Sequence, residues 1–153
     1  MLAPAFLFKE RKAIMENNNE KLFIGQSYEF SKVISDADVF NFAEVTGDKN
    51  PLHLDDDYAK TTIFKERIAH GMIGAGVISG AIGMHLPGPG TTYLGQELSF
   101  KQPIKINDRI TVKIEVIEII EKSKFNIVKL RTICLNPNGD VAIEGIATVI
   151  PPK

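Results

Sequence analysis

The segment from Ile68 to Leu86 constrains the fold more than any other part of the chain, because its 19 residues are almost all apolar. Its length approaches the roughly 20 residues that a membrane-spanning helix needs. However, charged anchors and an aromatic belt do not flank both ends. Its five glycines, from Gly71 to Gly83, each weaken a helix by about 0.8 to 1 kcal/mol relative to alanine. We therefore predict a helix buried in a globular domain and no membrane span, with other elements packed closely around the small residues.

The composition is that of one globular domain. The chain has 153 residues, of which 44% are hydrophobic and 24% are charged, as is typical of such a domain. Lysine and arginine total 18 and aspartate and glutamate total 19, so the formal net charge is -1. No general basic field therefore favours nucleic acid or an anionic membrane. The lone cysteine, Cys134, is expected to fill space in the core.

We predict a tail over residues 1–20, outside the core, and a single domain over residues 21–153. The tail places an apolar run before its basic residues, which is the reverse of a secretory signal. We expect a cytoplasmic protein, with a mitochondrial location left open for a eukaryotic source.

Predicted strands flank the apolar helix. Phe23 to Val33 is expected to be a strand interrupted at Gly25, and Ser35 to Asp38 favours a helix start, with Gly47 as the helix end. Asp55 to Asp57 predicts a short second helix, because acidic residues stabilise a first turn. Four more strands are predicted, and a change of phase near Val116 indicates a bulge or two covered faces: residues 91–102, 109–120, 125–135 and 141–150. This order predicts an α+β fold.

The segment from Thr46 to His53 contains a carboxylate and an imidazole, the two groups that acid–base chemistry needs. Gly47 and the Asn50-Pro51 pair favour a shaped loop over a helix. Asp48 and His53 are therefore candidate catalytic residues. The alternative is structural, with Asp48 capping a turn and His53 bonded to a carbonyl. We predict no cofactor and no metal. The three consecutive aspartates that follow point in different directions on a helix and do not converge on one ion.

The loop belongs to a wider pattern in which Phe42 precedes Thr-Gly-Asp-Lys-Asn-Pro-Leu-His and Ala59 follows six residues after the histidine. The pattern continues through Ala-His-Gly-Met, Ser-Gly and Tyr-Leu-Gly-Gln, at residues 69–72, 79–80 and 93–96. It resembles the motif of the MaoC-like, (R)-specific enoyl-CoA hydratases, also called the hydratase 2 family. The resemblance implies a hot-dog fold, in which a curved antiparallel sheet wraps around a long central helix. It also implies a homodimer with active sites near the subunit interface.

The resemblance implies reversible hydration of a trans-2-enoyl-CoA to a (3R)-hydroxyacyl-CoA, with Asp48 and His53 holding one water. The sequence does not show which of the two is the base, because coupled groups share their protons. Gly71 begins the long helix, where a free N–H and the helix dipole favour charge on the thioester oxygen. His70 is a candidate third group at the site, although bracing of the loop by this histidine is favoured.

Other residues are weaker candidates. Ser79 either contributes to the site or bonds the carbonyl four residues back, and Asn50 is a candidate substrate-binding or loop-shaping residue. Met72, Ile78 and Ile82 either line an acyl pocket or belong to the core. Four basic side chains are candidates for binding the CoA phosphates, although none belongs to a recognisable phosphate-binding motif: Lys65, Arg67, Lys101 and Lys105.

Three alternative functions remain open at this point. A (3R)-hydroxyacyl-ACP dehydratase runs the same chemistry in reverse on an acyl carrier protein, and sequence does not separate it from the hydratase. A hot-dog thioesterase is disfavoured because it does not need both Asp48 and His53. An acyl-CoA-binding module without catalysis would need no acid–base pair.

Overall fold

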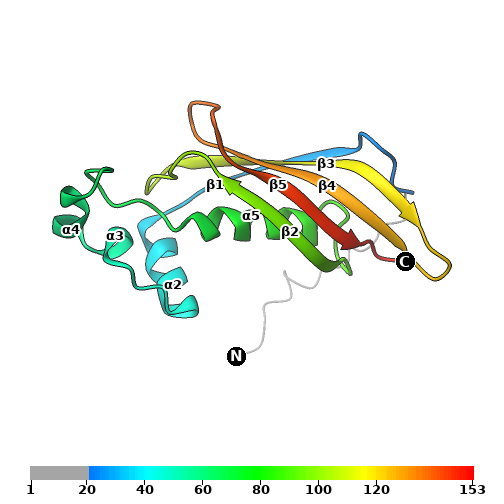
Figure 1. Cartoon of the computed structure of the whole chain (residues 1–153), viewed down its shortest axis with the longest axis horizontal. Coiled ribbons are helices and arrows are strands. Elements are labelled where there is room, and N and C mark those ends of the chain that lie inside the picture. The colour runs from blue at the N-terminus through cyan, green and yellow to red at the C-terminus, as the bar shows by residue number, and fades with distance from the viewer. Residues whose placement is uncertain (1–20) are drawn as a thin grey trace, which may run out of the picture.

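One antiparallel sheet forms the framework of residues 21–153, the part of the chain that the structure, a computed structural model, describes (Figure 1). Its strands lie in the order β1-β3-β4-β5-β2. The predicted tail over residues 1–20 lies outside the described residues. The strands have these bounds: β1 Ser27–Val33, β2 Thr92–Phe100, β3 Arg109–Glu121, β4 Asn126–Leu135 and β5 Val141–Ile150.

The sheet curves over a central helix, α5, which spans Gly71–Met84 (Figure 1). Ile78, Ala81 and Ile82 on this helix are fully buried in the core beneath the strands. Gly74 shows how close the packing is, because a Cβ atom there would collide with the side chains of Ile143 and Ile104. The predicted buried helix is therefore confirmed. Within residues 21–153, no helix is long and apolar enough to cross a membrane.

Three short helices gather at the end of the molecule where α5 begins (Figure 1). They are α2 (Asp36–Thr46), α3 (Pro51–Leu54) and α4 (Asp56–Thr61). Ser35 and Asp38 form a capping box at the start of α2, and Gly47 ends that helix with a φ of 77°, a backbone angle that glycine adopts readily. These boundaries confirm the predicted first helix and its glycine stop.

The strand predictions are confirmed with two refinements. The register between β3 and β4 shifts between Val116 and Glu118, so the phase change in the sequence marks a bulge, which adds a residue to one strand. β1 begins at Ser27 rather than at Phe23, because a turn at Ile24 and Gly25 precedes it. Cys134 is fully buried in β4, as predicted for an apolar filler. Together the elements confirm the α+β fold.

One prediction about the loop is wrong. Pro51–Leu54 forms the short helix α3, which carries His53, so only part of the segment from Thr46 to His53 is irregular. Asn50 is the N-cap residue, with its side chain accepting a hydrogen bond from Leu52 N–H, and Pro51 occupies the first helical position. An asparagine followed by a proline suits a helix start as well as a turn.

Candidate active site

Asp48 lies in the irregular segment between α2 and α3, at the surface. The segment is shaped by local hydrogen bonds. The Thr46 hydroxyl donates to the Phe42 carbonyl at 2.7 Å, and Asp48 N–H donates to the Thr46 hydroxyl oxygen at 3.2 Å. The Asp48 Oδ1 accepts from Asn50 N–H at 3.2 Å. The carboxylate thus has one oxygen bonded within the turn and sits where water can reach it.

His53 projects from α3 and is buried, with 8% of its surface exposed. Its Nδ1 lies 2.7 Å from the main-chain oxygen of Ile68. A carbonyl oxygen can only accept, so Nδ1 carries the hydrogen and the neutral ring presents an unprotonated Nε2. Burial lowers the pKa of His53 from its ordinary value, the Ile68 hydrogen bond opposes this, His70 lowers it further and Asp48 raises it. These features give His53 Nε2 the character of a base.

His70 is the residue immediately before α5, and only 2% of it is exposed. Its Nε2 lies 2.9 Å from the main-chain oxygen of Asp48, and its ring lies 4.0 Å from the His53 ring between centroids. It makes no side-chain hydrogen bond that caps α5. His70 therefore contacts the segment that carries Asp48 and does not cap α5.

The ligand atoms of Asp48, His53 and His70 all lie within 4.8 Å of one another, which is a spacing that a metal ion could use. The detailed geometry does not suit one. Two of the four ring nitrogens face carbonyl oxygens, and the remaining nitrogen of His70 is buried. The two rings are tilted by 32° relative to each other. The cluster is better suited to holding a water and moving its protons.

Gly71 meets this cluster at the N-terminus of α5. Its N–H belongs to the first turn, where a helix offers no internal partner. A Cβ atom on Gly71 would lie 2.8 Å from the Phe100 ring, so glycine lets β2 approach the helix closely. A cavity of about 470 Å³ opens at this point, and its lining includes His53, Gly71, Met72, Phe64, Phe100, Ile104 and Ile143. His53, Gly71 and an apolar wall therefore share one cavity.

Several predicted site residues lie elsewhere. Ile78 and Ile82 are fully buried in the core and do not line this cavity, so the core alternative holds for both. Ser79 is exposed on α5, about 12 Å along the helix from Gly71 at 1.5 Å per residue. Asn50 is occupied in capping α3. Of the three proposed acyl-pocket residues, Met72 alone lines the cavity.

The candidate phosphate-binding cations are mostly engaged in other contacts. Arg67 donates to Asp56 and Asp36 at 2.9 Å each and to the His53 carbonyl at 3.2 Å. It therefore joins α2, α4 and α3, the helix that carries His53, a role that no sequence motif indicated. Lys105 pairs with Glu66 at 2.6 Å and Lys101 with Glu144 at 3.2 Å, while Lys65 adopts a φ of 61°. Lys101 is the member of this set that lines the cavity.

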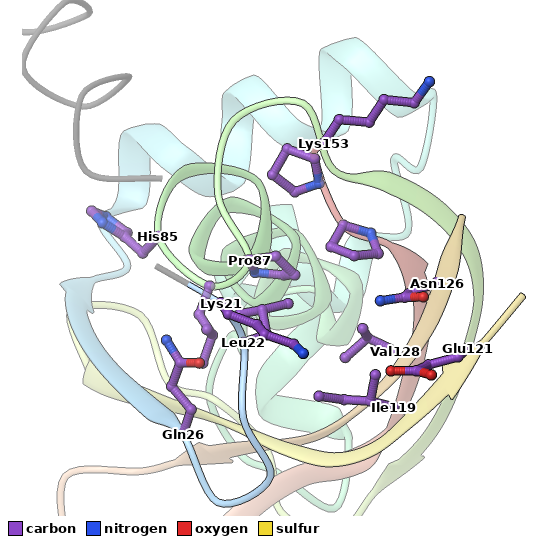
Figure 2. Close-up of a pocket in the computed structure, with 13 residues that line it drawn as sticks. Lys21, Leu22, Gln26, His85, Pro87, Ile119, Glu121, Asn126, Val128 and Lys153 are labelled. Atoms are coloured by element: carbon purple, nitrogen blue, oxygen red, sulfur yellow. The ribbon is translucent and has the colours of Figure 1, made fainter. Parts of the chain in front are cut away.

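A second cavity, of about 490 Å³, lies at the opposite end of α5, next to His85 and Pro87. Figure 2 shows His85 and Glu121 on opposite sides of it, so they do not form an acid–base pair like that of Asp48 and His53. The His85 ring also stacks on Tyr28, with the centroids 4.3 Å apart. The cluster of titratable groups that could carry acid–base chemistry therefore lies at the N-terminal end of α5.

The fold and the site together define a hot-dog protein with an aspartate and two histidines clustered beside the start of its central helix. Residues 19–134 match the family model described as MaoC like domain, and the chain belongs to this family. A relative from Rhodospirillum rubrum named (R)-specific enoyl-CoA hydratase is 48% identical over 128 residues, which are 84% of this chain and 87% of the relative.

A solved structure and a plant relative extend this similarity. The structure of an (R)-hydratase from A. caviae involved in PHA biosynthesis superposes with a TM-score of 0.82 and 41% identity, covering 87% of this chain and 99% of that one. A mitochondrial 3-hydroxyacyl-acyl-carrier-protein dehydratase from Arabidopsis thaliana is 36% identical over 133 residues, which are 86% of this chain and 79% of the relative. Both names describe addition or removal of water.

Proposed function

We propose that this protein is an (R)-specific enoyl-CoA hydratase, a hydro-lyase that converts a trans-2-enoyl-CoA reversibly into a (3R)-hydroxyacyl-CoA. The observation that carries the proposal is the cluster of Asp48, His53 and His70 where α5 begins, with His53 and Gly71 lining one cavity. Hydration needs a group that takes a proton from water, a group that returns a proton to carbon, and a donor for the thioester oxygen. We assign the first two roles to His53, with Asp48 holding the water, and the third to the Gly71 N–H.

The tautomer of His53 supports a defined sequence of proton transfers. A water hydrogen-bonded to both the Asp48 carboxylate and His53 Nε2 loses one proton to Nε2, and its oxygen forms a bond to C3 of the substrate. The C2–C3 π electrons move onto the thioester, which becomes an enolate. His53 then returns its proton to C2. Water has been added across one face, and both residues are restored.

Gly71 supplies the third requirement. Gly71 lines the cavity at the positive end of the α5 dipole, and its N–H is the donor that we assign to the enolate oxygen. The absence of a Cβ atom lets the thioester approach this N–H closely. One preorganised donor of this kind typically contributes about 100- to 1,000-fold in rate.

The acyl carrier is part of the proposal. We assign coenzyme A because the similar proteins with the higher identities carry hydratase names, whereas a less similar plant relative is named for the acyl-carrier-protein substrate. Turnover of crotonyl-CoA compared with crotonyl-ACP tests this assignment directly. A clear preference for the carrier-protein substrate would reassign the chain to the dehydratases. A cytoplasmic location is proposed with it, on the ground of the bacterial relative.

We also propose a homodimer. The outward face of α5 exposes Met72 and Met84, 55% and 46% accessible, alongside the small residues Gly76, Ser79 and Gly80. β2 pairs only with β5 in the described chain, so its other edge is open to a further strand. A second copy that covers this face would bury the apolar surface and bring Ser79 against another subunit.

Asp48→Asn and His53→Gln test the reaction itself. Each variant keeps a side chain of similar shape, and we expect each to fold, to bind crotonyl-CoA and to lose activity by about 100- to 10,000-fold, as is typical for a positioned acid or base. Hydration is followed by loss of enoyl thioester absorbance and binding by calorimetry. Wild-type rates in both variants would refute the mechanism. Binding without turnover by the unmodified protein would instead indicate an acyl-CoA-binding module.

A further inference from the structure

His70 is a buried polar residue that packing alone does not explain. It is 2% exposed, and its ring lies 4.9 Å from the Phe42 ring and 4.0 Å from the His53 ring. Its Nδ1 is buried with no hydrogen-bond partner among the described residues. A buried polar atom without a partner destabilises a fold, whereas leucine would fill the space without this loss. The presence of an imidazole here is therefore better explained by the hydrogen bond of its other ring nitrogen, Nε2.

That other nitrogen holds the segment that carries Asp48. The His70 Nε2 lies 2.9 Å from the main-chain oxygen of Asp48, 22 positions earlier in the chain. The carbonyl only accepts, so Nε2 carries the hydrogen of this bond. The hydrogen bonds that Asp48 N–H donates to Thr46 and that Asn50 N–H donates to Asp48 each span two residues. The contact with His70 is thus the one that ties Asp48 to the start of α5.

The same ring also orients His53. The two imidazoles lie 4.0 Å apart with 32° between their planes, so His70 covers one face of the His53 ring. The Ile68 carbonyl fixes one edge of that ring through Nδ1 at 2.7 Å. The hydrogen bond at Nδ1 and the contact with the His70 ring together fix the direction in which His53 Nε2 points. His70 therefore contacts both Asp48 and His53. Because these two residues come from different segments, His70 links the segments to each other.

We propose that His70 is a positioning residue for the hydration reaction: its Nε2–H fixes Asp48 through the main-chain oxygen, and its ring fixes His53, so that both act on one water. This inference rests on the proposed function. Misplacing reacting groups by about 1 Å can lower a rate by about 100-fold. His70 itself need not touch the substrate.

The pH dependence of the hydration rate gives a second measurement of the role of His70, because charged and titratable groups surround His53. Asp48 and His70 face the His53 ring, Arg67 contacts its main-chain oxygen, and Lys101 lines the same cavity. His70 lowers the pKa of His53, in addition to the larger effect of burial. Replacing His70 by a residue that cannot be protonated removes this contribution, so the acid limb of the rate profile is expected to move to higher pH.

Three substitutions of His70 separate positioning from structural support. In His70→Gln, the amide nitrogen can occupy the place of Nε2 and still donate to Asp48, whereas the shorter His70→Asn and the apolar His70→Leu cannot. We expect kcat for crotonyl-CoA within about 10-fold of wild type in the glutamine variant and about 100-fold lower in the other two. KM is expected to stay unchanged in all three. His70→Leu, which removes the unpartnered nitrogen, is expected to be no less stable to urea.

The outcomes distinguish this inference from the proposed function. Wild-type protein that does not hydrate crotonyl-CoA refutes the function. If wild type is active, unchanged kcat in His70→Asn and His70→Leu overturns the positioning role. The positioning role is also overturned if kcat and stability in urea fall together in all three variants, including His70→Gln. That result is expected of a histidine with a purely structural role. Rescue by glutamine alone, together with the displaced acid limb, supports it.

Discussion

At the scale of single residues, main-chain carbonyls decide what the histidines of the site can do. The Ile68 oxygen fixes the hydrogen of His53 on Nδ1, and the Asp48 oxygen fixes that of His70 on Nε2. Each imidazole is thereby held in one tautomer. His53 leaves its lone pair on Nε2 at the cavity, and His70 leaves its lone pair in the interior. The two histidines consequently present different nitrogens, although their rings are neighbours.

The lowered pKa of His53 predicts the pH dependence of the reaction. A base works when unprotonated, so activity is lost as pH falls through this pKa, and we expect the acid limb of kcat/KM below 6.5, the ordinary value for histidine. Stability is expected to fall in the same range. The unfolded chain binds a proton from about pH 6.5 downward, before the folded chain does.

Proton NMR of the histidine rings checks this titration independently of activity. The chain has three histidines, so His70→Gln and a substitution of His85 assign the signals. Asp48→Asn is the matched control. Asp48 raises the pKa of His53, and its removal is therefore expected to lower that pKa further. A His53 titration at or above 6.5 in wild type would contradict the base role assigned to its Nε2.

At the scale of elements, the glycines of α5 serve different purposes along the helix. Gly71 and Gly74 face other elements, since added Cβ atoms would meet Phe100 at the first position and Ile143 and Ile104 at the second. Gly76, Gly80 and Gly83 have nothing within 4 Å of an added Cβ atom in the described chain. The inner glycines set the distance between the helix and the sheet, and thereby place the Gly71 N–H beside His53.

Gly74→Ala tests this spacing. Alanine improves helix propensity by about 1 kcal/mol, yet overpacking of a tight core typically costs about 1 to 3 kcal/mol, so we expect a net loss of stability in urea unfolding. Ile143→Val removes the Cδ1 atom that the new methyl group would meet, and the double variant should recover part of the loss. Gly83→Ala is the control and should be neutral or stabilising. Equal gains from both alanines would show that the sheet does not restrict α5 at Gly74.

At the scale of the whole molecule, periodicity and glycine positions were sufficient to predict the α+β fold. The alternation of apolar and polar residues over 109–120 predicted β3 and its bulge, and the apolar run over 68–86 predicted α5. The segment after Asn50 was mispredicted because Asn-Pro starts turns and helices alike. Asp48 and His53 were singled out as the candidate catalytic pair by a family pattern. Arg67, which joins three helices, and Phe100, which packs on Gly71, depend on contacts between distant segments that local sequence does not encode.

The assembly of two chains is the prediction that belongs to this scale. Helix α5 exposes small residues between Met72 and Met84, and a stable interface of standard size buries about 800 Å² on each partner. A charge placed in such an interface would be removed from water without a partner. We therefore expect wild-type protein to sediment as a dimer at micromolar concentration and Gly76→Glu to sediment as a monomer.

Gly76→Glu is informative because its effect cannot come from the isolated chain. An added side chain at Gly76 meets nothing within 4 Å in the described residues, and glutamate favours a helix more than glycine does. Asn138→Glu, in the exposed β4–β5 turn, is the charge-matched control and should remain dimeric. If only Gly76→Glu dissociates and its hydration rate falls, the outward face of α5 is an interface that the site requires. A monomeric wild type with full activity would instead show that one chain suffices.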